Sequence, residues 1–153
     1  RVRGVNGRVN DNGVDLNRNW PSHWQADWPR DGCWKYTPVT AGAEPGSEPE
    51  TQALRDWLSA LQSEYANVTV LYFHAAFSPD GLVTPGTHLT PSDGRELGDA
   101  PSREVGQALA EAAGYGYDNH WPGGYRVTGD ASTWAVAHLM RSLTVEPCDI
   151  MNL

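Results

Sequence analysis

The sequence predicts an α/β protein, because segments with helical periodicity alternate with short runs of β-branched and aromatic residues. Two segments, residues 54–61 and 105–112, repeat apolar side chains at the spacing of one helix face. Two others, residues 68–73 and 143–145, have the composition of strands. The chain has 153 residues, of which 39% are hydrophobic, with seven Trp and six Tyr. A chain of this length should bury about 70% of its unfolded surface, which is enough for a core.

The first expected helix covers residues 48–64. Residues 1–46, before it, are rich in Gly, Asn, Pro and Trp without periodicity, so we expect loops with short extended pieces there. Ser47 and Glu50 have the spacing of a capping box. The apolar face that follows consists of Leu54, Trp57, Leu58 and Leu61.

Residues 68–73 form a nearly continuous β-branched and aromatic run, as expected for a strand buried on both faces. His74 follows at the carboxyl end of this strand. In open α/β sheets ligands bind at that edge. The position therefore favours a functional histidine, although a lone histidine after a strand is more often a structural residue.

The remaining elements are a loop, two helices and a strand. Residues 79–98 are rich in Pro, Gly, Asp and Ser and predict a long surface loop. A helix should follow, with Pro101 in its first turn and Gly114 as its cap. Residues 132–140 predict a short helix, and residues 143–145 a last strand that ends at Glu146. Neither a repeat nor a linker interrupts the chain, so we expect one domain over residues 1–153.

Charge and cysteine content limit the classes of partner. The net charge of -8 and the pI near 4.9 argue against nucleic acid and against an anionic membrane surface. No apolar run approaches the roughly 20 residues that span a bilayer. Cys33 and Cys148 fit no metal-binding spacing. A disulfide between them would suit an exported protein, whereas two unpaired thiols are the alternative.

Residues 13–20, Gly-Val-Asp-Leu-Asn-Arg-Asn-Trp, together with Arg8 look like an anion-binding loop. A planar guanidinium beside an amide can hold a carboxylate through several charge-assisted hydrogen bonds. The alternative, which local chemistry alone would favour, is a polar turn with Arg18 solvated.

Five segments, in this order along the chain, resemble the zinc carboxypeptidase family of metallopeptidases. They are Arg8, residues 17–20, residues 46–51, residues 71–74 and residues 142–146. The resemblance implies an open mixed β-sheet flanked by helices, a zinc cofactor and a peptide substrate with a free C-terminal carboxylate. The family's first two zinc ligands come from a His-x-x-Glu motif upstream of the Asn-Arg pair, and this sequence has no such motif. We therefore expect the chain to correspond to the C-terminal two-thirds of such an enzyme, with the N-terminal segment as a further partner.

The resemblance also implies roles for single residues at the reaction centre. His74 corresponds to the third zinc ligand, and a catalytic zinc keeps three protein ligands and a water. Glu146 corresponds to the general base that takes a proton from that water. Arg8 aligns with the arginine that stabilises the oxyanion of the tetrahedral intermediate.

Other matching positions concern the substrate and the metal's surroundings. Asn17 and Arg18 correspond to the pair that binds the terminal carboxylate. Tyr125 falls where the family has a mobile tyrosine that covers this carboxylate, although loop packing would explain it equally well. Asp15 corresponds to the acid that orients the first zinc histidine.

Substrate preference is indicated by residues 129–134, which are small and polar, and by Arg126, which would suit an acidic or zwitterionic residue. The chain looks most similar to bacterial members, including murein-peptide peptidases, so a cell-wall peptide and an extracellular or periplasmic location are expected. Two other hypotheses stay open. One is a non-catalytic peptide- or carboxylate-binding module. The other is a saccharide-binding domain, suggested by the cluster of Trp20, Trp24, Trp28 and Trp34.

Overall fold

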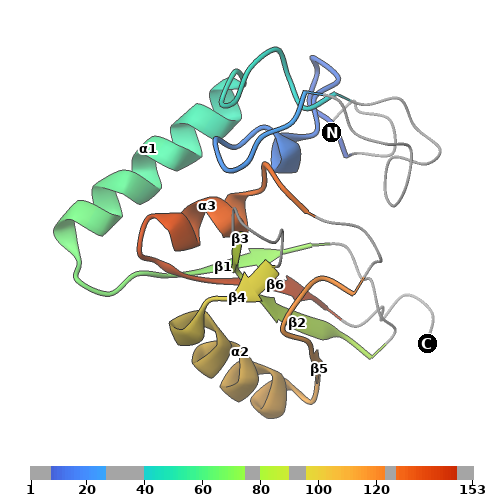
Figure 1. The fold of residues 1–153 in the computed structure, drawn as a ribbon, viewed down its shortest axis with the longest axis vertical. Coiled ribbons are helices and arrows are strands. Elements are labelled where there is room, and N and C mark those ends of the chain that lie inside the picture. The colour runs from blue at the N-terminus through green and yellow to red at the C-terminus, as the bar shows by residue number, and fades with distance from the viewer. Residues whose placement is uncertain (1–7, 27–39, 75–79, 90–95, 123–126, 148–153) are drawn as a thin grey trace. The chain divides into compact units, whose positions relative to one another are not determined.

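The computed structural model describes residues 8–26, 40–74, 80–89, 96–122 and 127–147 (Figure 1). Tertiary contacts divide the chain into two compact units. Unit 1 consists of Arg1–Ala66 and Gly123–Trp134, and unit 2 consists of Asn67–Pro122 and Ala135–Leu153. The single domain expected over residues 1–153 stays a prediction.

Unit 1 contains the long helix α1 (Pro49–Glu64) and a network of irregular chain that includes the short 3-10 helix η2 (Leu16–Arg18). The irregular part has only isolated bridges among its described residues, such as the antiparallel one between Val9 and Asp15. This matches the loops with short extended pieces expected for residues 1–46. Among the described residues of unit 1, the buried apolar side chains are Val9, Val14, Trp20, Ala41, Leu58, Ala131 and Trp134.

Helix α1 has the predicted extent, but its start differs from the prediction. Pro49 occupies its first turn, where the missing N–H costs nothing. The N-cap residue is Glu48, whose side chain makes no capping hydrogen bond. The Ser47 hydroxyl donates to Glu48 Oε1 at 2.8 Å. The capping box of Ser47 and Glu50 is therefore wrong, because the neighbouring carboxylate binds the hydroxyl that would have capped the helix.

Unit 2 is built on a four-stranded sheet in the order β1-β6-β2-β5. Its strands are β1 (Thr69–Phe73), β6 (Arg141–Glu146), β2 (Leu82–Pro85) and β5 (Gly116–Tyr117). Strands β1 and β6 pair parallel, β6 and β2 antiparallel, and β2 and β5 parallel. The sheet is therefore open and mixed, which confirms the predicted fold class.

Helix α2 (Ala100–Ala113) packs against β2, β5 and β6 (Figure 1). The core between them contains Val83, Ala110, Leu143 and Val145. Gly106 allows the close approach, since a Cβ there would lie 3.0 Å from Leu143 Cδ2 and 3.1 Å from Tyr117 Cε2. The helix has the predicted limits, because Asp99 caps its first turn and Gly114 ends it with a left-handed φ of 69°.

Two predictions about this part of the chain are wrong. The expected loop over residues 79–98 contains β2 and a hairpin of β3 (Thr87–Leu89) and β4 (Glu96–Gly98). Strand β1 is at the edge of the sheet rather than buried on both faces, and Phe73 is 67% exposed. The buried strands are β2, in which all four residues are buried, and β6, in which four of six residues are buried.

Helix α3 (Ala131–Ala137) confirms the short helix expected near residues 132–140, although it ends earlier. Among the described residues, no helix has the combined length and apolar character needed to cross a bilayer.

Candidate active site

His74 and Glu146 lie side by side at the carboxyl ends of two adjacent strands of unit 2. Strands β1 and β6 run parallel with Phe73 opposite Val145, and the His74 N–H donates to the Val145 carbonyl at 3.0 Å. His74 Nδ1 is 3.9 Å from Glu146 Oε1. Glu146 is only 4% exposed, whereas the His74 side chain is partly open to solvent. The structure thus places these two residues together at adjacent strand ends, and their chemical roles remain predictions.

The described residues do not form a zinc site by themselves. They contain no group of three or more His, Cys, Asp or Glu side chains that could hold a metal ion. A catalytic zinc takes three protein ligands and a water. If His74 binds a zinc ion, the three-ligand set would have to include residues outside the described ones.

In unit 1, Asn17 is oriented by a contact with the start of α3. The Ala131 N–H donates to Asn17 Oδ1 at 3.1 Å, which fixes the oxygen of the amide on that side. The Asn17 backbone N–H donates to Asp15 Oδ1 at 3.1 Å. Both the backbone and the side chain of Asn17 are therefore held by hydrogen bonds. No described residue accepts a hydrogen bond from Asn17 Nδ2, and Asn17 is partly exposed. The Asn17 amide nitrogen is therefore available as a hydrogen-bond donor.

Arg18 is buried, with 2% exposure, so the polar turn with a solvated Arg18 is wrong. Its Nη1 donates to the Asn17 carbonyl at 2.7 Å. The backbone of Arg18 lies against Gly129, where φ is +66° and a Cβ would collide with the Arg18 carbonyl oxygen. Only glycine allows this close approach without strain. The segment that begins α3 thus holds the Asn17–Arg18 turn in place.

Arg8 and Asp15 form an ion pair, with 2.7 Å between Nε and Oδ2. Asp15 is buried and also caps η2, whereas Arg8 is partly exposed. The oxyanion role of Arg8 and the histidine-orienting role of Asp15 are not tested by this contact.

Asn19, to which the sequence analysis gave no role, is a central residue of unit 1. Its side chain is completely buried. Nδ2 donates to the Ala41 carbonyl at 2.8 Å, to the Glu44 carbonyl at 3.2 Å and to Ser47 Oγ at 3.0 Å. Oδ1 accepts from the Glu48 N–H at 3.1 Å. The second asparagine of the Asn-Arg-Asn-Trp run was the available signal, since an amide carries two donors and an acceptor for loop backbone.

Glu48 is a second residue that the sequence analysis missed. It accepts hydrogen bonds from Asn12 Nδ2 at 2.8 Å and from Asn10 Nδ2 at 2.7 Å. Burial by itself would raise the pKa of Glu48, but the hydrogen bonds from Asn12, Asn10 and Ser47 outweigh it and lower the pKa. The carboxylate therefore ties residues 10–12 to the start of α1.

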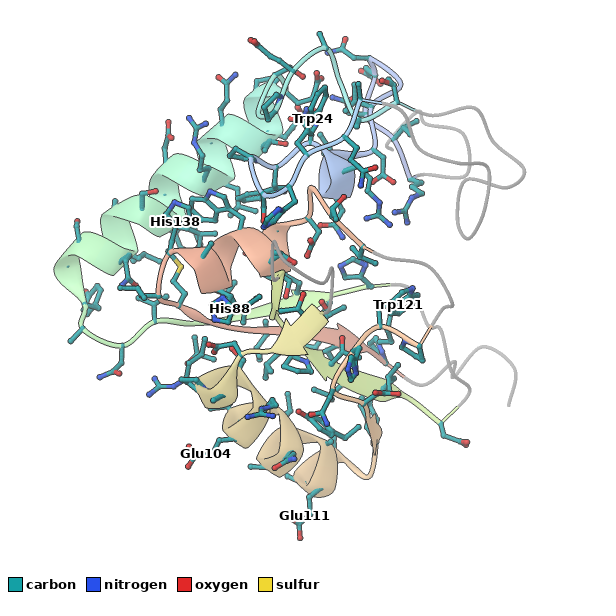
Figure 2. The ribbon with its side chains drawn as sticks, in the orientation of Figure 1. Trp24, His88, Glu104, Glu111, Trp121 and His138 are labelled. Carbon is teal, nitrogen blue, oxygen red and sulfur yellow. The ribbon has the colours of Figure 1, made fainter. Side chains whose placement is uncertain are left out.

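The tryptophan cluster does not form an exposed stacking surface in the described residues. Trp20 is 3% exposed and packs on Trp134, with ring centroids 5.1 Å apart. The ring N–H of Trp24, labelled in Figure 2, donates to the Ala41 carbonyl at 3.0 Å. Trp20 is therefore a core residue, which removes one of the four side chains behind the saccharide hypothesis. Several residues that the sequence analysis singled out lie outside the described residues, so the structure does not test the predictions made for them. They are Trp28, Trp34, Tyr125, Arg126, Cys33 and Cys148.

Comparison with known protein families shows to which family this chain belongs. The profile described as zinc carboxypeptidase matches residues 3–150 of this chain. The chain belongs to the zinc carboxypeptidase family. The family is named for zinc-dependent carboxypeptidases.

Two kinds of relative show how far the likeness extends. Murein peptide amidase A of Escherichia coli K12 is 38% identical over 73 residues, which is 44% of this chain and 28% of the relative. The crystal structure of murein-tripeptide amidase MpaA from Escherichia coli O157 has a TM-score of 0.61 at 25% identity, covering 89% of this chain and 50% of that one. Carboxypeptidase A from Helicoverpa armigera has a TM-score of 0.59 at 23% identity, covering 86% of this chain and 32% of that one, and shows a shared fold. The chain thus spans half or less of the length of each of these three relatives.

Proposed function

We propose that this protein is a zinc-dependent carboxypeptidase that hydrolyses the peptide bond next to a free C-terminal carboxylate. The observation that carries the proposal is the pair of His74 and Glu146, an imidazole and a buried carboxylate 3.9 Å apart at the carboxyl ends of parallel strands. Polar side chains at this edge of an α/β sheet are typical of ligand and active sites.

Glu146 is the general base in this proposal. Its carboxylate takes a proton from the water whose oxygen attacks the peptide carbonyl carbon. When the carbon–nitrogen bond breaks, the same proton passes to the leaving amine, and the carboxylate is restored. His74 is the proposed metal ligand. Since the described residues supply no three-ligand set, the other zinc ligands would come from residues outside the described ones. Glu146 performs both proton transfers.

Asn17 and Arg18 bind the terminal carboxylate in this proposal. The amide Nδ2 of Asn17 is presented as a donor because its oxygen is held by the Ala131 N–H. A buried guanidinium makes a stronger charge-assisted hydrogen bond to an anion than a solvated guanidinium does, because the local dielectric is lower. Arg8 as oxyanion donor and Tyr125 as cover of the bound carboxylate complete the assignment.

The proposed substrate is a cell-wall peptide, and the proposed location is extracellular or periplasmic. Support for the substrate comes from the names of the relatives, which are amidases of murein peptides.

The two alternatives to a peptidase remain a non-catalytic carboxylate-binding module and a saccharide-binding domain. Burial of Trp20 weighs against the saccharide-binding domain.

The recognition half of the proposal is tested with Arg18→Lys. A peptide with a free C-terminal carboxylate should bind the protein more tightly than its amide. A charge-assisted hydrogen bond contributes about 1.5–3 kcal/mol, so Arg18→Lys should weaken binding of the acid by roughly ten-fold or more. The matched control is Arg55→Lys on α1, where Arg55 pairs with a neighbouring exposed Asp56, and this change should leave binding unaltered. Equal affinity for acid and amide would contradict the assignment.

The catalytic half is tested with Glu146→Gln in protein that is supplied both with zinc and with the segment expected to carry the family's His-x-x-Glu motif. Release of the C-terminal amino acid should fall by about 10²–10⁴-fold, the usual contribution of a general base, while binding of the acid persists. The control is Glu104→Gln, because Glu104 is exposed on α2 and points away from the sheet in Figure 2. Binding of the acid by a wild-type protein that never hydrolyses it would favour the non-catalytic module.

A further inference from the structure

Helix α1 of unit 1 has apolar side chains in water beside the face that it buries. The buried face contains Thr51 and Leu58. Leu54, Trp57 and Leu61 follow one another along a neighbouring side of the helix, and we call these three residues the apolar stripe. Trp57 is 57% exposed and Leu54 is 37% exposed, whereas Leu61 is partly buried. Contiguous large apolar side chains in water are unusual on a protein surface and mark a site of interaction.

The neighbours of Trp57 on α1 leave its indole accessible to another helix. Ala53 and Ala60 lie one turn before and one turn after Trp57, and both are exposed. Their side chains are too small to cover the indole, so a second helix can approach closely. Apolar residues at this spacing are the anchors by which amphipathic helices pack on one another. This side of α1 therefore fits the apolar face of a second helix.

A carboxylate lies at each end of the apolar stripe. Glu50 and Glu64 are each seven residues from Trp57, so the three side chains lie nearly in one row along α1. With a rise of about 1.5 Å per residue, the two glutamates are about 21 Å apart along the helix axis. Both are exposed, and neither forms an ion pair with a described residue. The other two charged residues of α1, Arg55 and Asp56, pair with each other.

This arrangement of charges disfavours a second copy of the chain as the partner. In an antiparallel pair of α1 helices centred on Trp57, Glu50 of each copy would face Glu64 of the other. In a parallel pair, each glutamate would face the same glutamate of the other copy. Like charges that face each other destabilise a helix pair, and the net charge of -8 adds to the repulsion. Positive charges at both ends of the partner's apolar face are complementary instead.

We propose that the apolar stripe of α1 binds a basic amphipathic helix of another protein. Apolar residues of that helix pack on Leu54 and Trp57, and two lysines or arginines, about fourteen residues apart, pair with Glu50 and Glu64. The buried aromatic contact supplies most of the affinity, and the charges at the rim set orientation and association rate. This interaction goes beyond the proposed peptidase function and does not depend on it.

The test uses two helix-forming peptides with the same leucine stripe, which carry either lysine or glutamate at two positions fourteen residues apart. Their binding to the 153-residue chain is followed by fluorescence anisotropy of a label on the peptide. The lysine peptide should bind about ten-fold or more tightly than the glutamate peptide, and salt should reduce the difference. Trp57→Ser should weaken binding of the lysine peptide by about ten-fold or more, because aromatic residues at the centre of an interface carry much of its energy. Trp57 is exposed, so this variant should remain folded.

The charge at one end of the stripe is tested with Glu64→Lys. This change should weaken binding of the lysine peptide and strengthen binding of the glutamate peptide. Glu64 is changed rather than Glu50, because Glu50 accepts long hydrogen bonds from Asn10. The matched control is Glu104→Lys, which changes the net charge equally at an exposed position of α2 and should leave both affinities within about two-fold.

Equal wild-type affinity for the two peptides, or binding of neither at about 1 mM, would overturn the inference. Binding of the lysine peptide that survives in folded Trp57→Ser would overturn it as well, since the overall acidity of the chain would then attract the peptide. A wild-type dimer in sedimentation that becomes a monomer in Trp57→Ser would assign the stripe to a second copy instead. The wild-type comparison of the two peptides decides even where a variant does not fold.

Discussion

Replacing Asn19 with alanine should destabilise the protein severely. The side chain is fully buried and makes three well-formed hydrogen bonds, to the Ala41 carbonyl, Ser47 Oγ and the Glu48 N–H, besides a longer one to Glu44. Each such bond contributes about 1 kcal/mol net, and partners left buried without a substitute cost more, so we expect a loss of about 3 kcal/mol or more. Against a typical total of about 5–15 kcal/mol, this is a large fraction.

Urea unfolding followed by tryptophan fluorescence measures this loss, because Trp20 packs on Trp134 in the same unit. With a urea dependence of about 1–3 kcal/mol per molar, a loss of about 3 kcal/mol should lower the midpoint by roughly 1–3 M. The control is Asn67→Ala, since Asn67 is exposed and accepts one hydrogen bond, from Arg141 at 3.3 Å, and should change stability by about 0.5 kcal/mol or less. A loss below about 1 kcal/mol for Asn19→Ala would refute the view that this amide holds the loops of unit 1 together.

Two further predictions concern pH and metal. The pKa of Glu48 is lower in the folded protein than its ordinary value of 4.5, so its contribution to stability is present above that value and is lost as the pH falls through the folded pKa. In Glu48→Gln, the free energy of unfolding should therefore decrease less steeply as the pH falls than it does in the wild-type protein. Urea titrations at a series of pH values measure this, and an unchanged pH dependence would count against the prediction. Calorimetric titration of the 153-residue chain with zinc should show little saturable uptake, because the described residues contain no three-ligand group. Tight, stoichiometric uptake would mean that other residues of the chain complete the site.

The helices were predictable because their signals are local. Repeating apolar positions located α1 and α2, and Gly114 marked the end of α2 at the residue where φ turns positive. Strands β3 and β4 have three residues each, which is too short for a periodic pattern. The edge position of β1 was missed because composition identifies a strand but not its neighbours, and Phe73 looks the same at an edge as in the centre.

In the candidate site, residues that belong to a sequence motif could be predicted, whereas residues that matter through long-range contacts could not. His74 and Glu146 were identified because each directly follows or ends a recognisable strand of a known family pattern. Asn19 and Glu48 were missed because their importance depends on contacts that form only in the folded chain. A buried amide and a buried carboxylate oxygen cannot be distinguished from solvated ones in the sequence.

The parallel pairing of β1 with β6 also affects how this protein folds. The two strands are neighbours in space, yet β2 to β5, α2 and α3 all lie between them in the chain. Closing so long a loop costs entropy before any contact compensates for it, and non-local strand pairing of this kind slows folding. His74 and Glu146 meet only when that loop has closed. The chemistry of this edge is therefore assembled late, after the local helices and the β3–β4 hairpin have had time to form.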